Sequence, residues 1–257
     1  MIERDSCFSD KWGFSRMSVP TSVKRAINIL LKSINHVVVH RDHVGSVDRF
    51  VSAVHRAGLS PKTVIDVGVA FGTSWLYEGF KGAKLHLVDP TRESLPHMQE
   101  ISRRIGAEIH NIALGEKSGA MEIALRKTIV HATLMKDVTG PEITSRYAVP
   151  IVRFDELFPA VESPAFCKID VEGAEMMVLR GMGEQIHSLD GIVVETSMIP
   201  LYEGGADFSE LIQFMASNGF AFYDYAGVNR RPFDGALHQI DAFFVPNESP
   251  LRVRRWA

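Results

Sequence analysis

Residues 167–175, Cys-Lys-Ile-Asp-Val-Glu-Gly-Ala-Glu, place two carboxylates, Asp170 and Glu172, at the end of an apparent strand that a glycine turn joins to a helix. Far upstream, residues 63–73, Thr-Val-Ile-Asp-Val-Gly-Val-Ala-Phe-Gly-Thr, show a second junction of strand, glycine and helix. Two such junctions indicate one open α/β sheet, in which ligands bind in a crevice at the carboxyl ends of the strands. We therefore predict a site where the two junctions meet.

Strands and helices alternate on both sides of these junctions. Strands are predicted at 63–67, 84–88, 107–112, 165–170 and 191–196, and helices at 73–81, 94–105, 174–187 and 207–218. Repeated strand-helix units predict a mostly parallel sheet with helices on both faces, and short strands that lack polar alternation fit burial on both faces. A loop too short for a crossover helix joins strands 220–225 and 240–245, which predicts that the sheet ends in an antiparallel strand.

Three further segments accompany this sheet domain, which is predicted over residues 61–248. A helical cap is expected over residues 1–60, because apolar residues recur at helical spacing from Val23 to Ile34 and again from Val44 to Val54. The insertion at 116–150 contains a hairpin-like stretch and is expected to lie near an acceptor site. Residues 249–257 form a basic tail. The apolar stripe of the first cap helix fits either a homodimer contact or docking on the chain's own sheet.

The composition narrows the classes of partner. With 257 residues, 46% of them hydrophobic, the chain can bury a sizeable core, and its net charge of -3 offers no basic field for nucleic acid. The only cysteines are Cys7 and Cys167, so neither a disulfide framework nor a zinc site of cysteine pairs is available. No apolar run is long enough to span a membrane. We expect a cytoplasmic protein that acts on a small-molecule or glycan acceptor.

The first junction indicates a particular ligand. Its glycines, Gly68 and Gly72, are spaced G-x-x-x-G rather than the G-x-G-x-x-G of dinucleotide folds. Asp66 beside this turn would repel a pyrophosphate and attract the ammonium of a bound amino-acid group, which S-adenosylmethionine carries. Asp89 ends the next strand 23 residues later, near the spacing at which a carboxylate accepts ribose hydroxyls. The alternative is that both acids only cap turns.

Four motifs together resemble those of the FkbM family of S-adenosylmethionine-dependent methyltransferases. They are residues 66–72, Val88-Asp89-Pro90, residues 111–115 and, most specifically, residues 168–175. The resemblance covers residues 60–246 and implies a class I, Rossmann-like methyltransferase fold. It also implies methyl transfer, usually to a hydroxyl of a sugar, glycolipid or polyketide-type product. The family more often has Glu at the ribose position, where this chain has the shorter Asp89.

These observations define a predicted cofactor site for S-adenosylmethionine. Its residues are Asp66, Gly68, Ala70, Gly72, Thr73, Asp89, Asn111 and Ala113. Asn111 and Ala113 are included because they follow the third strand, where the adenine edge would lie. Lys168 interrupts an apolar strand, where a cation needs a partner, and we interpret it as structural.

Asp170 is the first candidate to hold or deprotonate the acceptor hydroxyl, with Glu172 orienting the substrate or the backbone. His131, in the insertion, is a candidate base near neutral pH, and its alternative is a surface residue. Glu172 and Glu175 have an alternative role in helix-start electrostatics. Asp170, Glu172 and Glu195 could instead gather a divalent cation such as magnesium.

The predicted function is that of an S-adenosylmethionine-dependent O-methyltransferase. One alternative is an NAD-dependent oxidoreductase on a related sheet, which the glycine spacing and the acid at the first turn disfavour. Another is a non-catalytic binding protein that retains the fold, with residues 1–60 as its interaction surface.

Overall fold

This computed structural model describes Val23, residues 47–137 and residues 142–252. The chain divides into two units, Met1–Val44 and Gly45–Ala257. Within the predicted cap, helix α2 (Val47–Arg56) belongs to the second unit. The predicted helix from Val23 to Ile34 lies outside the described residues except for Val23, as do residues 253–257 of the predicted tail.

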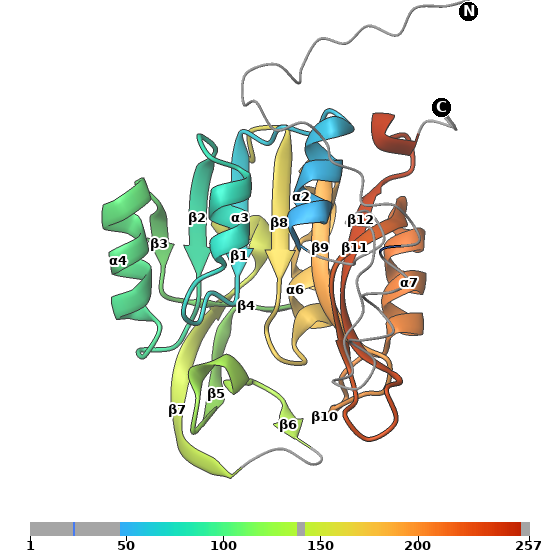
Figure 1. Cartoon of the computed structure of the whole chain (residues 1–257). Helices are drawn as coiled ribbons and strands as arrows, with labels where there is room; N and C mark the ends of the chain where they lie inside the picture. The colour runs from blue at the N-terminus through green and yellow to red at the C-terminus, as the bar shows by residue number, and fades with distance from the viewer. Residues whose placement is uncertain (1–22, 24–46, 138–141, 253–257) are drawn as a thin grey trace, which may run out of the picture. The chain divides into compact units, whose positions relative to one another are not determined.

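The second unit is built on a seven-stranded sheet with the order β11-β12-β9-β8-β1-β2-β3 (Figure 1). The strands are β1 (Thr63–Val67), β2 (Lys84–Val88), β3 (Glu108–His110), β8 (Ala165–Ile169), β9 (Gly191–Ser197), β11 (Phe220–Arg230) and β12 (Leu237–Pro246). β3, β2, β1, β8 and β9 pair in parallel, and β12 lies antiparallel between β9 and β11. The predicted sheet is thus confirmed, including its antiparallel strand.

Helices cover both faces of this sheet (Figure 1). One face carries α2, α3 (Ser74–Gly79) and α4 (Leu95–Ile105), and the other carries α5 (Phe154–Leu157), α6 (Glu175–Gly181) and α7 (Phe208–Ser217). Because strand residues alternate between faces, Ile65 and Val67 join the core beneath α6, whereas Val64 joins the core beneath α3. Every residue of β1 and β8 is buried, which fits their mostly apolar composition, and the two charged exceptions, Asp66 and Lys168, pair with each other.

The insertion forms a small sheet of its own at the carboxyl ends of the main strands (Figure 1). Its strands β4 (Ala113–Leu114), β7 (Ile143–Val152) and β5 (Gly119–Arg126) lie in the order β4-β7-β5. β5 and β7 pair antiparallel, so the predicted hairpin-like stretch is part of β5. The 3₁₀ helix η3 (Ile129–His131) follows β5, and β6 (Lys136–Asp137) pairs with β10 (Tyr202–Glu203).

The helix predicted at 174–187 is shorter in the structure. α6 ends at Gly181 and is followed by a separate 3₁₀ helix, η4 (Gly183–Ser188). Gly183 has φ +50°, a left-handed conformation that a right-handed helix cannot include, so the break occurs there. The last two strands are longer than predicted, and the start of the predicted tail forms a 3₁₀ turn, η5 (Pro250–Arg252), with Leu251 buried.

Candidate active site

A cavity of about 400 Å³ lies at the carboxyl ends of β1, β2 and β8. The loops that follow these three strands line it, together with β4 and part of the insertion. Nine of the predicted site residues line this cavity, namely Gly68, Ala70, Gly72, Thr73, Asp89, Ala113, Asp170, Glu172 and Glu195. Asp66, Asn111 and His131 are not among its lining residues. The two junctions quoted from the sequence therefore meet in one place.

Neighbouring protein atoms leave no room for a side chain at the glycines of the first junction. Gly68 has φ +84°, and a Cβ built there would lie 1.7 Å from the backbone oxygen of Asp170. A Cβ on Gly72, at φ +108°, would lie 2.8 Å from Ile101 Cδ1. Gly68 therefore allows the loops after β1 and β8 to approach each other closely.

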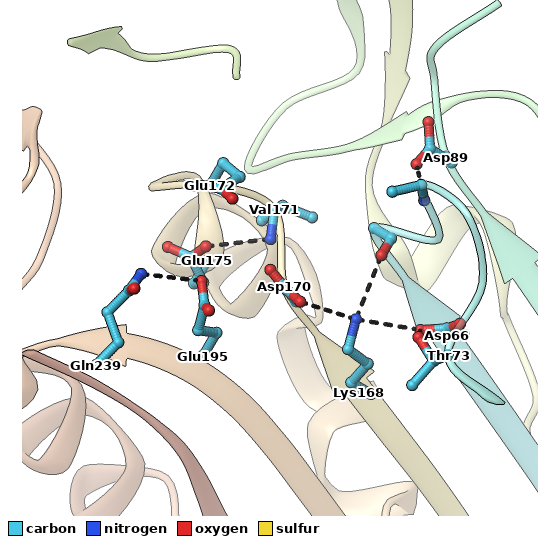
Figure 2. Close-up of polar contacts among 12 residues, drawn as sticks. Asp66, Thr73, Asp89, Lys168, Asp170, Val171, Glu172, Glu175, Glu195 and Gln239 are labelled. Atoms are coloured by element: carbon cyan, nitrogen blue, oxygen red, sulfur yellow. Dashed lines mark hydrogen bonds and ion pairs between the residues drawn. The ribbon is translucent and has the colours of Figure 1, made fainter. Parts of the chain in front are cut away.

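Beneath this loop, Asp66 and Lys168 form a buried ion pair across two strands (Figure 2). They are direct partners in the β1–β8 register, and Lys168 Nζ lies 3.5 Å from Asp66 Oδ1. The same ammonium lies 3.1 Å from Asp170 Oδ2 and donates to the backbone oxygen of Gly68 at 3.3 Å. Lys168 thus connects the first junction to the second.

The two oxygens of Asp66 have partners within the protein. Tyr77 donates to Oδ2 at 2.5 Å and Thr73 donates to Oδ1 at 3.2 Å, and the residue is fully buried. Burial raises the pKa of Asp66, and Lys168 acts in the opposite direction. Burial would lower the pKa of Lys168, but Asp170 and Asp66 outweigh it and raise that pKa. Asp66 thus contacts Lys168, Tyr77 and Thr73 and does not line the cavity, and its contact with a cofactor ammonium stays a prediction.

Asp89, at the end of β2, is almost completely buried and organises the next loop. Its Oδ1 accepts hydrogen bonds from the Thr91 amide at 2.9 Å, the Thr91 hydroxyl at 2.7 Å and the Ser94 hydroxyl at 2.7 Å. Its Oδ2 accepts from the Ala70 amide at 2.9 Å. An ionised carboxylate oxygen can accept more than one hydrogen bond, so Oδ2 retains capacity for a ligand hydroxyl.

Asn111 supports this loop from the neighbouring strand. Its side-chain amide donates to the backbone oxygens of Asp89 at 2.8 Å and Thr91 at 3.0 Å. The adjacent residues Ile112 and Ala113, rather than Asn111, line the cavity. Asn111 accordingly positions the loop that carries Asp89.

Three carboxylates converge on the wall opposite Asp89 (Figure 2). Asp170, Glu172 and Glu195 each offer one oxygen, and these oxygens lie within 4.8 Å of one another. Burial, together with the neighbouring acids, raises the pKa of Glu195, and burial raises that of Glu172. Gln239 donates to Glu195 at 3.3 Å. Acids packed this closely favour sharing a proton or holding a cation.

Glu172 links this group to the insertion. It adopts φ +53°, and its backbone oxygen accepts from the Thr133 hydroxyl at 2.6 Å. Its side chain accepts from the Tyr202 hydroxyl at 2.5 Å and lies 3.4 Å from His131 Nδ1. His131 is about half exposed, so the two separately predicted candidates form a pair that extends from the cavity wall to the solvent.

Glu175 serves the turn before α6. Its Oε1 accepts from the backbone amides of Val171 at 3.2 Å and Gly173 at 3.0 Å, and burial raises its pKa to about 7. A carboxylate on these amides fixes the turn that presents Asp170 and Glu172. The helix-start role expected for Glu175 agrees with this geometry.

Sequence reasoning missed the part that three polar residues play in the site. Lys168 lines the cavity in addition to its structural role, and Tyr77 and Tyr202 hold Asp66 and Glu172. The only signal in the sequence is the charge of Lys168 within an apolar strand. The two tyrosines are distant from their partners in sequence, so no local pattern connects them.

Comparison with models of known protein families assigns the chain to one of them. The family model described as methyltransferase FkbM domain matches residues 66–222, more than half of the chain. The chain belongs to the FkbM methyltransferase family. It is therefore an S-adenosylmethionine-dependent methyltransferase with a class I, Rossmann-like fold, which confirms the resemblance seen in the sequence. The alternative of an NAD-dependent oxidoreductase is wrong.

Many solved structures are similar to this chain at low sequence identity. A magnesium protoporphyrin IX methyltransferase from Synechocystis PCC 6803 with bound cofactor is 13% identical, with a TM-score of 0.43 over 90% of this chain and 100% of that chain. A 1,6-didemethyltoxoflavin-N1-methyltransferase from Burkholderia thailandensis is 14% identical, with a TM-score of 0.41 over 91% of this chain and 93% of that chain. A fibrillarin from Aeropyrum pernix is 13% identical, with a TM-score of 0.42 over 78% of this chain and 76% of that chain. Comparison with curated proteins gave no match.

The cavity of this FkbM-family chain has the chemistry that S-adenosylmethionine requires. Asp89 offers a carboxylate oxygen for a ribose hydroxyl, and Ile112, Ala113 and Leu114 form an apolar wall next to it. Among the helices of residues 47–137 and 142–252, none combines the length and hydropathy of a membrane-spanning segment.

Proposed function

We propose that this FkbM-family methyltransferase methylates a hydroxyl of a sugar, glycolipid or polyketide-type small molecule. The observation that supports this proposal is the convergence of Asp170, Glu172 and Glu195 on one wall of the cavity. An acceptor hydroxyl loses its proton as it becomes methylated, and a carboxylate within hydrogen-bond reach can take that proton. The aliphatic residues of the insertion, which line the same cavity, can pack against the carbon skeleton of such an acceptor.

In this proposal Asp170 accepts the hydrogen bond of the acceptor hydroxyl and removes its proton. Its contact with Lys168 fixes the direction of the carboxylate and leaves it one-third exposed. Glu172 orients the acceptor, and its contact with His131 gives the proton a route to solvent. Glu195 is held by Gln239 and lies behind them, where its raised pKa favours a shared proton.

The cofactor residues predicted from the sequence enter the proposal with two changes of role. Asp89 holds the ribose hydroxyls through Oδ2, and Gly68, Ala70, Gly72 and Thr73 form the loop against which the cofactor lies. Asp66 acts through Lys168, and Asn111 acts through the loop that carries Asp89. When bound, S-adenosylmethionine supplies a methyl group activated by a sulfonium.

The same three carboxylates are also spaced to hold a divalent cation such as magnesium, with Asp170 and Glu195 as ligands. Such an ion would polarise the acceptor hydroxyl and replace the carboxylate base. Methyl transfer measured with EDTA, and then with added magnesium, separates the two mechanisms. Activity that survives EDTA supports Asp170 as the base, and activity that requires magnesium assigns the polarising role to the ion.

Three further expectations remain proposals. A small-molecule rather than a nucleic-acid acceptor agrees with the net charge of -3 and the acidic wall of the cavity. A cytoplasmic location and a homodimer rest on the sequence alone.

Replacement of Asp170 by Asn tests the proposed function. The full chain is incubated with methyl-labelled S-adenosylmethionine and a panel of hydroxylated saccharides, glycolipids and polyketides. We expect transfer by Asp170→Asn to fall by about 100- to 10,000-fold, because Asn cannot take the proton. Stabilisation by S-adenosylhomocysteine in a thermal-shift assay should persist. The matched control is Asp234→Asn, which lies in the turn between β11 and β12, away from the cavity.

Two results would contradict the proposal. Wild-type rates in Asp170→Asn would remove Asp170 from proton transfer. Cofactor binding by the wild type with no transfer to any hydroxyl acceptor would contradict the acceptor class and favour the alternative of a non-catalytic binding protein.

A further inference from the structure

A second cluster of chemistry-bearing side chains lies at the edge of the main sheet, outside the cavity. It consists of His86 on β2 with Glu108 and His110 on β3. His86 is the register partner of Glu108, and His110 lies two residues further along β3. Because strand side chains alternate between faces, all three side chains lie on the same face. None of the three is a lining residue of the cavity.

The donor atoms of this cluster are close together. His86 Nδ1 lies 3.1 Å from His110 Nε2 and 3.3 Å from Glu108 Oε2. One donor atom from each residue lies within 4.8 Å of the other two. Phe158 packs edge-on against both imidazoles, with centroid distances of 5.2 and 5.4 Å, and so limits their rotation.

Within the protein, at most one proton on His86 Nδ1 serves both of its neighbours. A neutral imidazole nitrogen carries either one proton or one lone pair. With a proton, His86 Nδ1 must divide it between His110 and Glu108. With a lone pair, it faces the carboxylate of Glu108 at 3.3 Å without a proton between them.

The separations of His86 Nδ1 from the other two donor atoms match the edge of a zinc coordination tetrahedron. Zinc bonds of about 2.0–2.1 Å to nitrogen and oxygen place neighbouring tetrahedral ligands about 3.3 Å apart. We propose that His86 Nδ1, His110 Nε2 and Glu108 Oε2 form a site for a divalent transition metal, with Zn²⁺ as the fitting ion. Glu108 is about half exposed, so the solvent side leaves the fourth position to water.

Surrounding contacts prepare the ligands for this role. Lys84 lies 2.9 Å from Glu108 Oε1 and thereby directs the other oxygen, Oε2, toward His86. Partners of this kind orient metal ligands in protein sites. Two imidazoles and one carboxylate are a donor set that suits zinc better than magnesium, which prefers oxygen ligands.

The proposed metal site lies next to the loop that carries Asp89, so a bound ion would affect the stability of that loop. The backbone oxygen of His110 accepts from the Asp89 amide at 3.1 Å, and Asn111 holds the loop that follows. A metal that joins β2 to β3 would therefore stabilise the strand ends that carry the cofactor loop. The proposed site is thus a structural clamp at the edge of the sheet, separate from the reacting groups.

Zinc binding to the full chain provides the test. Isothermal titration with zinc chloride should show one saturable site, and Co²⁺ at the same site should give the visible absorption of a tetrahedral complex. His110→Ala and Glu108→Gln should each weaken binding by on the order of 100-fold or more. The matched control, His187→Ala, removes an exposed histidine from η4 and should leave binding unchanged. Circular dichroism melting establishes that each variant is folded, and Glu108→Gln preserves the shape of a half-exposed side chain if His110→Ala does not fold.

Two results would overturn the proposal. One is the absence of saturable zinc binding by the wild type. The other is binding that survives both His110→Ala and Glu108→Gln, which would place the ion at other ligands, such as the sequence histidines His36, His40 and His43 or the acids near Asp170.

Discussion

At the scale of single residues, Lys168 has the largest effect on the site. It is the cross-strand partner of Asp66 and lies on the same face of the sheet as Asp170, two residues further along its own chain. A buried ion pair contributes little net stability, because desolvation opposes the attraction, but the loss of one partner leaves an uncompensated charge. Lys168 also holds the backbone oxygen of Gly68, so the pair fixes the relative position of both junctions.

Replacement of Lys168 by Met should therefore be strongly destabilising. We expect the free energy of unfolding to fall by about 3–5 kcal/mol, because buried Asp66 loses its cation. Urea denaturation at pH 7 measures the change. The control is Lys62→Met, whose ion pair with Glu162 is largely exposed and should contribute about 0–1 kcal/mol. Equal losses in the two variants would show that the buried pair has no special role.

At the scale of elements, the insertion completes the cavity that the main sheet begins. β5 and η3 contribute Ile123, Ile129 and Val130 to the lining, and the segment after η3 contributes Ala132 and Leu134. These residues are aliphatic, whereas the strand ends across the cavity carry acids. The division fits an acceptor whose carbon skeleton packs on the insertion and whose hydroxyl faces Asp170.

Val130→Asp tests this division. The new carboxylate has no partner on the aliphatic wall, so we expect the KM for the acceptor to rise by about tenfold or more. The affinity for S-adenosylhomocysteine should change much less, and stability should change little because Val130 is 38% exposed. Val228→Asp on β11 is the matched control, with 43% exposure outside the cavity, and should leave both constants unchanged. A loss of cofactor affinity alone in Val130→Asp would assign this part of the insertion to the cofactor.

At the scale of the whole molecule, buried acids beside the cavity make the free energy of unfolding of the protein depend on pH. Burial raises the pKa of Glu175 to about 7, and burial with Asp170 raises that of Asp241 to about 6. An acid with a raised pKa in the folded state binds its proton more tightly there than in the unfolded chain. Stability from such a group is present below its unfolded pKa and declines as the pH rises to the folded pKa.

Replacement of Glu175 by Gln should reduce the decline in the free energy of unfolding as the pH rises. Gln can accept the same hydrogen bonds from Val171 and Gly173 but has no proton to lose. Between pH 5 and pH 8, we expect the free energy of unfolding to fall by about 1–3 kcal/mol less in Glu175→Gln than in the wild type. Urea denaturation at each pH measures the difference, with exposed Glu100→Gln as the control. Parallel curves for wild type and Glu175→Gln would contradict the assignment.

Short-range patterns determined the strands, the helices and the family. Runs without polar alternation, such as 63–67, predicted strands buried on both faces, and a short connection predicted that the last two strands run antiparallel. The residues 168–175 predicted where the acidic wall lies, because the strand, the turn and the helix start are contiguous in sequence. The break at Gly183 was not predicted; a Cβ there would lie 2.7 Å from Asp155 Oδ2, a contact between segments distant in the chain that no local pattern reveals.

Only the tertiary structure decided which of these residues meet. The neutralisation of Asp66 by Lys168, the contact of Glu172 with Tyr202, and the approach of His86 to His110 each join segments distant in the chain. The register of the strands and the packing of loops set such contacts, and neither follows from local composition. The sequence by itself determined a parallel sheet of the FkbM methyltransferase family with acids at its carboxyl edge. The structure decided which acids face the cavity and which lie beneath it, because burial and partner choice are properties of the assembled fold.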